Sequence, residues 1–119
     1  ADNDVLTEMV NAIVREINQE QVIVFGSYAR GDAKIDSDVD LLIIEREPFG
    51  NGRSRRKEIA RIRKILSGFR IPKDILVYSI EELNKWKHSI NHVISYSLRE
   101  GKLFYEKIFP LLAISRLYL

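Results

Sequence analysis

The sequence predicts an α/β (α+β) fold in which a small mixed β-sheet is flanked by helices. Two continuous β-branched and aromatic runs, at residues 22–25 and 39–44, have the length and composition of buried strands. Two segments with helical periodicity, at residues 5–17 and 54–69, precede the first run and follow the second. Helices and strands that alternate in this way are typical of a sheet covered by helices.

The first half of the chain contains one helix and two strands. An amphipathic helix begins after the acidic segment 2–4, and its apolar face consists of Val5, Leu6, Met9, Val10, Ile13, Val14 and Ile17. The period then changes, and Val22–Phe25 forms a strand that stops at Gly26. Val39–Ile44 forms the second strand, and a segment rich in Pro and Gly at residues 48–52 follows it.

The second half adds two helices and two strands. One apolar helical stripe runs from about residue 54 to residue 69, and residues 74–78 read as a third strand. A capping box at Ser79 then predicts the start of a helix that continues to Gly101. Residues 103–105 follow as a short edge strand.

Length and composition favour a single domain over residues 1–119. The chain has no cysteine, which excludes disulfides, thiolate metal sites and a cysteine nucleophile, and we expect a cytoplasmic location. No apolar run approaches the roughly 20 residues that cross a bilayer, so we expect no membrane partner. The net charge of +2 is too small to indicate a nucleic-acid partner by itself.

An acidic pair begins the second predicted strand. Side chains alternate along a strand, so Asp38 and Asp40 project to the same side while Val39 points into the core. Two neighbouring carboxylates repel each other, and a divalent cation between them removes that cost. Mg²⁺ prefers oxygen ligands and is usually held by one or two carboxylates together with substrate phosphates. Taken alone, however, the pair is more typical of two surface acids at the start of a strand.

The turn after the first strand has features of a phosphate-binding loop. Gly26 allows the backbone to approach a phosphate without a Cβ in the way. Ser27 supplies a hydroxyl and an N–H at the start of a short helical segment, where backbone donors favour an anion. Arg30 adds a positive charge that can contact the same phosphates. A tight turn with an ordinary helix cap is the alternative.

The topology brings a third acid to the same place. If the strands at 22–25 and 39–44 are antiparallel neighbours, the loop after the first lies beside the acids that begin the second. The helix at 54–69 then makes a crossover connection, so the strand at 74–78 runs parallel to the second strand. Asp74, the first residue of this strand, therefore lies at the same sheet end as the acidic pair. Three acids and a phosphate loop at one end outline a two-metal site.

A family resemblance follows from these residues. Gly26-Ser27, ten intervening residues and Asp38-Val39-Asp40 resemble the G-S-x₁₀-D-x-D signature of the polymerase-β-like nucleotidyltransferase superfamily. Through Arg30-Gly31 and the segment 37–41, the chain is most similar to the minimal nucleotidyltransferases, the MNT group. The third acid and the late segment 99–106 extend the similarity over most of the chain. The resemblance implies the nucleotidyltransferase fold of this superfamily.

The resemblance also implies roles for individual residues. The expected catalytic and metal-binding residues are Asp38, Asp40 and Asp74. The expected nucleotide-binding residues are Gly26, Ser27, Arg30 and Ser37. In the family, the first two acids hold two Mg²⁺ ions, and the third completes one metal site and helps activate the attacking hydroxyl. All positions carry matching residue types, so the resemblance implies an active enzyme that uses ATP.

The implied function is that of an antitoxin enzyme. MNT proteins similar to this one are commonly partners of HEPN-domain RNases, and some silence the toxin by adding AMP to one of its tyrosines. The chain is therefore expected to move AMP from ATP onto a hydroxyl of a HEPN-type protein. Two alternatives stay open: a non-catalytic antitoxin that acts by occlusion, and transfer to a small molecule such as an aminoglycoside. Intact carboxylates weigh against the first, and the lack of a substrate domain weighs against the second.

Three other features have plain interpretations. A basic run at residues 53–64 is expected to be a solvated helix face, because no aromatic residues interleave with it to stack nucleic-acid bases. His88 and His92 are four residues apart but have no third ligand in a recognisable motif, so we expect no metal site there. Tyr28 is expected to pack beside the sheet.

The last twelve residues, 108–119, form an apolar tail that would be costly to leave in water. One interpretation is that the tail closes the core of its own domain. The other is an interface with a second copy of the chain, giving a homo-oligomer, or with a different protein. Both interpretations stay open at this point.

Overall fold

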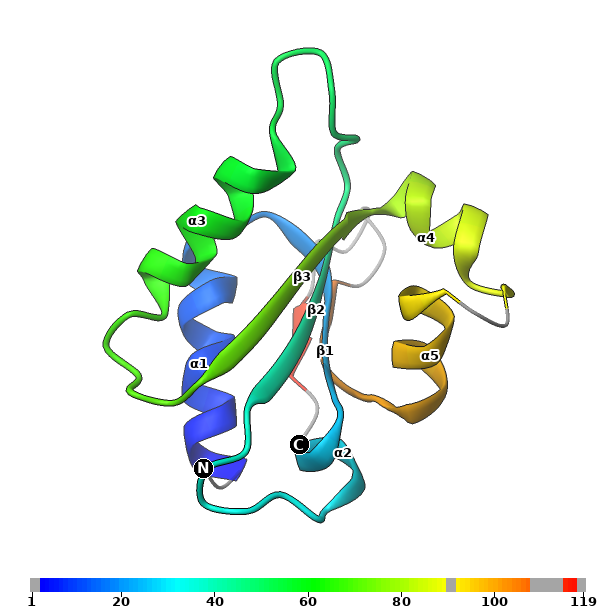
Figure 1. Cartoon of the computed structure of the whole chain (residues 1–119). Coiled ribbons are helices and arrows are strands. Elements are labelled where there is room, and N and C mark those ends of the chain that lie inside the picture. The colour runs from blue at the N-terminus through cyan, green and yellow to red at the C-terminus, as the bar shows by residue number, and fades with distance from the viewer. Residues whose placement is uncertain (1–2, 90–91, 108–114, 118–119) are drawn as a thin grey trace.

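The computed structural model describes residues 3–89, 92–107 and 115–117. A five-stranded mixed sheet has the order β3-β2-β1-β4-β5 (Figure 1). Its strands are β1 (Gln19–Phe25), β2 (Val39–Glu45), β3 (Lys73–Ser79), β4 (Lys102–Lys107) and β5 (Ser115–Leu117). β1 pairs with β2 and β4 in antiparallel fashion, and β2 pairs with β3 in parallel. The expected mixed α/β sheet is confirmed.

Helices cover both faces of this sheet. Their bounds are α1 (Asn3–Glu16), α2 (Ser27–Arg30), α3 (Arg55–Ile65), α4 (Ile80–Trp86) and α5 (Val93–Glu100). α1 and α3 lie on one side, whereas α4 and α5 lie on the other (Figure 1). None of the helices in the described part of the chain is both long and apolar enough to cross a membrane.

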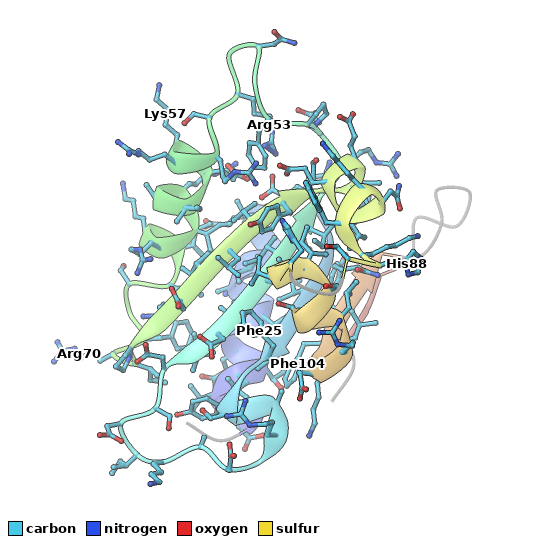
Figure 2. All side chains as sticks on the ribbon, turned by 45° about the vertical axis from the view of Figure 1, so that its right-hand side comes forward. Phe25, Arg53, Lys57, Arg70, His88 and Phe104 are labelled. Atoms are coloured by element: carbon cyan, nitrogen blue, oxygen red, sulfur yellow. The ribbon has the colours of Figure 1, made fainter. Side chains whose placement is uncertain are left out.

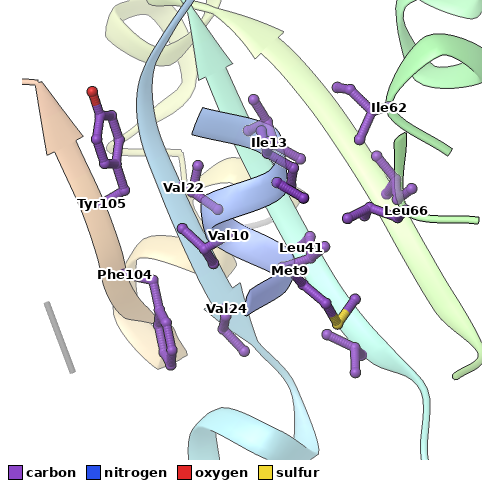
Figure 3. Packing of buried hydrophobic residues seen from close by; sticks show 14 of the residues in the cluster. Met9, Val10, Ile13, Val22, Val24, Leu41, Ile62, Leu66, Phe104 and Tyr105 are labelled. Carbon is purple, nitrogen blue, oxygen red and sulfur yellow. The ribbon is translucent and has the colours of Figure 1, made fainter. Parts of the chain in front are cut away.

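The core explains why β2 is an unbroken apolar run. Leu41 and Ile43 belong to the larger cluster beneath α1 and α3, in which Met9, Ile13 and Ile62 also pack (Figure 3). Leu42 and Ile44 point to the opposite face and belong to a second cluster near α4. A strand that is buried on both faces needs apolar side chains at successive positions. β2 is therefore a central, rigid support for the acids at its N-terminal end.

Two strands differ from expectation. β1 begins at Gln19, three residues earlier than expected, because the polar segment Gln19–Gln21 pairs with the end of β2 despite its lack of apolar pattern. The strand expected at residues 103–105 is present as β4, but its expected edge position is wrong. β4 is longer and lies between β1 and β5, so within the described residues the edge strands are β3 and β5.

The single helix expected between Ser79 and Gly101 is wrong, because the chain makes two helices there. The capping box at Ser79 is present and starts α4, which ends at Trp86. A turn follows, in which the Ser89 N–H donates to the Trp86 carbonyl at 3.0 Å. His92 then starts α5 as a new N-cap, since its Nδ1 accepts from the Ile94 N–H at 3.1 Å. Its ring also stacks on the Trp86 ring, with the two ring centroids 4.6 Å apart. This contact joins α4 to α5.

The apolar tail enters the described structure only in part. Ser115–Leu117 forms β5 and pairs with β4 in antiparallel register. Residues 108–114 and 118–119 lie outside the described residues. The described segment of the tail therefore extends the sheet of its own domain, and the interface remains an expectation.

Glu45 is a buried carboxyl group at the C-terminal end of β2, and it lies beside Arg53, which Figure 2 labels. Its side chain is 3% exposed and accepts a hydrogen bond from the Arg53 guanidinium. Burial, and after it the neighbouring Glu58 carboxyl, raise the pKa of Glu45 from 4.5 to about 8, although Arg53 opposes the rise. The folded protein therefore holds this proton more tightly than the unfolded chain does.

We expect the stability of the protein to depend on this proton. Its contribution is complete below about pH 4.5 and is lost as the pH rises through about 8. The free energy of unfolding, measured with urea at several pH values, should fall over this range in the wild type and change less in Glu45→Gln. Glu8→Gln, at an exposed position of α1, is the matched control and should behave as the wild type. An equal pH dependence in Glu45→Gln and the wild type would contradict the shift.

Candidate active site

Three acidic residues lie at the end of the sheet where β2 and β3 begin. Asp40 is the second residue of β2, and Asp38 directly precedes this strand. In the parallel β2–β3 pair, the Cα atoms of Asp40 and Asp74 are register partners. Val39 is fully buried, whereas Asp38 and Asp74 are exposed and Asp40 is half-buried. Strand alternation and the crossover connection thus bring the three predicted acids to the same end of the sheet.

Electrostatic interactions link these acids. Burial raises the pKa of Asp40, and the charges of Asp74 and Asp38 raise it further, while the charge of Arg30 lowers it. Both other acids are therefore near enough to disfavour the charged form of Asp40. A cation placed among the three carboxylates would relieve this repulsion.

Gly26 joins the predicted phosphate loop directly to the acids. Its φ of 74° and ψ of −150° form a backbone conformation that is largely restricted to glycine. A Cβ at this position would collide with Oδ2 of Asp40, so the loop backbone lies against that carboxylate. The register partner of Asp40 on β1 is Phe25, which Figure 2 labels, and the loop begins one residue later. The sequence predicts a close approach at Gly26 but gives no signal that Asp40 is the group approached.

The loop continues into α2, a single helical turn. The Arg30 N–H donates to the Gly26 carbonyl at 3.0 Å, and the Gly31 N–H donates to the Ser27 carbonyl at 3.0 Å. Ala29 is buried and fixes this turn on the sheet, whereas Ser27 is half-buried and the Arg30 side chain is 44% exposed. Backbone N–H groups in the first turn of a helix lack partners within it and favour anions. Tyr28 packs against the core, as expected.

Ser37, expected to contact the nucleotide, makes two hydrogen bonds to the backbone of Lys34. Its hydroxyl accepts from the Lys34 N–H at 2.7 Å, and its own N–H donates to the Lys34 carbonyl at 3.0 Å. These two bonds close a turn over residues 34–37, directly before Asp38. The hydroxyl thus shapes the segment that delivers the first acid, a role for which the motif alone gives no signal.

The donor set fits Mg²⁺ in its chemistry. The described residues contain no group of three or more His, Cys, Asp or Glu side chains arranged so that they could hold a metal ion. Mg²⁺ does not need such a cage, because it usually takes one or two carboxylates and completes its coordination with water and substrate phosphates. Asp38 and Asp40 supply hard oxygen ligands beside the Gly26 loop, where those phosphates are expected. The site therefore suits an ion that arrives with its nucleotide.

The basic run around α3 serves partly to hold the fold. Arg53 pairs with buried Glu45, and Arg55 pairs with Glu82 of α4 and donates to the Val77 carbonyl. Arg61 donates to the Glu16 carbonyl at the end of α1 at 2.9 Å. The remaining cations are exposed and are Arg56, Lys57, Arg63 and Lys64. The prediction of a mainly solvated helix face agrees with these positions, but it missed the three structural arginines.

The two histidines are not arranged as a metal pair. His88 lies in the turn after α4, and His92 caps α5 with one ring nitrogen. The spacing of four residues therefore does not correspond to one helical face.

Comparison with known families identifies the fold and the signature. Residues 7–100 match the model of the nucleotidyltransferase domain family, and this matched segment contains all the predicted site residues. A segment of 61 residues is 44% identical to a protein of Methanocaldococcus jannaschii that is provisionally named a protein adenylyltransferase. That match covers 51% of this chain and 57% of the archaeal protein, so it spans little more than half of the relative's length.

Solved structures share the architecture. A Sulfolobus solfataricus protein provisionally described as a nucleotidyltransferase aligns with a TM-score of 0.60 at 22% identity, covering 87% of this chain and 79% of its own. A toxin–antitoxin structure with AMP-PNP aligns with a TM-score of 0.54 at 21% identity, covering 82% of this chain and 70% of the other. A protein provisionally described as a minimal nucleotidyltransferase aligns with a TM-score of 0.52 at 26% identity, covering 83% of this chain and 89% of the other.

These matches confirm the resemblance that the signature indicated. The family model covers most of the chain, and each of the three solved structures aligns with more than four-fifths of it. The protein belongs to the nucleotidyltransferase domain family.

Proposed function

We propose that this protein is a Mg²⁺-dependent nucleotidyltransferase that moves AMP from ATP onto a hydroxyl group of a HEPN-type toxin, and so acts as its antitoxin. The observation that carries the proposal is the placement of Asp38, Asp40 and Asp74 at the sheet end where the Gly26 loop touches the Asp40 carboxylate. Reaction in the cytoplasm agrees with the absence of cysteine.

The proposed reaction is an in-line displacement at the α-phosphorus of ATP. The acceptor hydroxyl oxygen forms a bond to this phosphorus, the bond to the β-phosphate oxygen breaks, and pyrophosphate leaves. Asp74 is exposed beside Asp40 and accepts the proton that the acceptor hydroxyl loses. The Gly26–Ser27 backbone orients the triphosphate, and Arg30 offsets its negative charge.

Asp38 and Asp40 would hold the metal in this reaction, and Asp74 would complete one of two sites. Mg²⁺, when bound, neutralises phosphate charge and favours the ionised form of the attacking hydroxyl. The carboxylates themselves are kept near each other by the rigid, doubly buried β2 strand and its register with β3. Preorganisation of this kind supplies much of the rate enhancement in phosphoryl transfer.

Two comparisons support the nucleotide and the partner. The archaeal relative bears the name of a protein adenylyltransferase, which agrees with AMP as the transferred group and a protein as the acceptor. A structural neighbour is a toxin–antitoxin structure with AMP-PNP, which agrees with an ATP-like substrate and a toxin partner. The HEPN class of that partner rests on the MNT resemblance of the signature.

The test is co-expression of this chain with the product of the neighbouring gene, followed by intact-mass measurement of both proteins. We expect a mass gain of one or more AMP groups on the partner with wild-type protein and none with Asp38→Asn. Glu81→Gln is the control, because this acid is also exposed but lies in α4, which follows the other end of β3 from Asp74. Its activity should equal that of the wild type.

The alternatives give different outcomes. Silencing of the partner by wild type and Asp38→Asn alike, without any change of mass, would favour an antitoxin that acts by occlusion. AMP transfer to an aminoglycoside, with none to the partner, would favour a small-molecule acceptor. Either result would overturn the proposed function.

A further inference from the structure

An exposed isoleucine lies in the loop that connects α2 to β2. The side chain of Ile35 is 99% exposed. Among the large apolar side chains of the described residues, Leu98 on α5 is the other exposed one, at 38%. Most of the apolar side chains nearby, such as Val39 and Ala29, are buried in the core. Ile35 thus makes almost no contribution to the packing of the domain.

A closed turn holds this side chain outward. The turn spans Lys34 to Ser37, and the Ser37 N–H and hydroxyl both bond to the Lys34 backbone, at 3.0 and 2.7 Å. Ile35 and Asp36 form its tip. Further back, the Asp32 N–H donates to the Ser27 carbonyl at 3.1 Å, which ties the start of the loop to α2. The backbone therefore presents Ile35 without help from side-chain packing, and ordering it on binding costs little entropy.

The turn stands at the rim of the candidate active site. Asp38 follows it directly, and the next residue, Val39, donates its N–H to the Pro72 carbonyl at 2.8 Å. That bond fixes the end of the loop beside the start of β3, two residues before Asp74. An acceptor that brings a hydroxyl to Asp74 approaches this same end of the sheet. A large acceptor would therefore contact the rim as well as the acids.

We propose that Ile35 is a docking contact for the protein acceptor, and that it enters an apolar depression on the acceptor surface near the modified hydroxyl. This inference rests on the proposed function and specifies how the partner is recognised. It identifies Ile35 as a binding and specificity residue outside the metal and nucleotide site.

The chemistry of the tip favours a protein over a nucleic acid. Nucleic acids are held mainly by cations on phosphates and by aromatic stacking on bases. Here the aliphatic side chain stands between Lys34 and Asp36, whose opposite charges cancel, and no aromatic residue lies in the turn. An apolar side chain framed by mixed charges is typical of the centre and rim of a protein–protein contact.

The test measures the affinity of the complex in a form that does not react. Each variant is placed in an Asp38→Asn background, and its Kd for the partner protein is measured by calorimetry. We expect Ile35→Ser to raise Kd by about 10- to 100-fold, which corresponds to loss of one buried aliphatic side chain. Leu98→Ser is the matched control, because it removes the other exposed apolar side chain, and it should leave Kd unchanged. Ile35→Val should retain most of the affinity.

Two further measurements exclude a structural or nucleotide role. Because Ile35 is exposed, Ile35→Ser should unfold at the wild-type urea concentration and should bind ATP with wild-type affinity. Unchanged Kd for the partner in Ile35→Ser would overturn the inference, and so would a loss confined to ATP binding. Absence of AMP transfer by the wild type would overturn the proposed function alone, since complex formation by the Asp38→Asn background still reports on Ile35.

Discussion

Replacement of Asp40 by Asn is expected to reduce nucleotide transfer by about a thousandfold or more while the fold stays intact. Asn has nearly the same shape as Asp, so the contact with the Gly26 loop can persist. It lacks the negative charge that attracts a divalent cation, and Asp38 and Asp74 would then have to hold the metal without it. The measurement is the rate of AMP transfer at saturating ATP and Mg²⁺.

Stability separates the loss of chemistry from loss of structure. Burial and two neighbouring acids raise the pKa of Asp40, so its charge is unfavourable in the folded protein without metal. The Asn variant should therefore be at least as stable as the wild type towards urea in the absence of divalent ions. Retention of Mg²⁺-dependent transfer by Asp40→Asn would refute the assignment of this residue.

The second large effect is expected for Gly26→Ala. An alanine Cβ would collide with Oδ2 of Asp40, and a φ of 74° with a ψ of −150° is itself strained for alanine. Either the loop or the Asp40 carboxylate has to move, and both belong to the proposed site. We expect transfer to fall at least a hundredfold and the free energy of unfolding to fall by about 1–3 kcal/mol.

Gly31→Ala is the matched control for backbone strain. Gly31 also has a positive φ, 83°, but no atom lies within 4 Å of the position of an added Cβ. This variant should lose some stability through strain and keep most of its transfer rate. If both glycine variants lost activity equally, the contact between Gly26 and Asp40 would have no special role.

The site could be read from the sequence to the extent that backbone geometry determines it. Strand alternation relates Asp38 to Asp40, and the handedness of a crossover brings Asp74 to the same end, so a correct strand assignment was sufficient. Direct contacts such as that of Gly26 with Asp40 depend on exact backbone torsion angles and leave no pattern in the sequence. The use of the Ser37 hydroxyl in a turn is hidden for the same reason, because serine suits a turn and a phosphate site equally well.

The fold too divides into elements that sequence pattern predicted and boundaries that it did not. Apolar runs predicted the centres of β1, β2 and β3, because these segments are buried. The polar start of β1 at Gln19 carries no such signal, since backbone pairing alone defines it. The break after Trp86 was missed because apolar spacing continues across it, while the second helix start depends on a histidine acting as a cap. Histidine is not among the residues that usually mark an N-cap.

The central claim is that the three acids and the Gly26 loop bind a divalent ion and a triphosphate together. A crystal structure of the protein with Mn²⁺ and a non-hydrolysable ATP analogue tests it directly, because anomalous scattering locates the ion. We predict manganese between the carboxylates of Asp38 and Asp40 and the triphosphate against the backbone of Gly26 and Ser27. Manganese at another site, such as beside Glu45 and Glu58, with the analogue bound away from the loop, would contradict it.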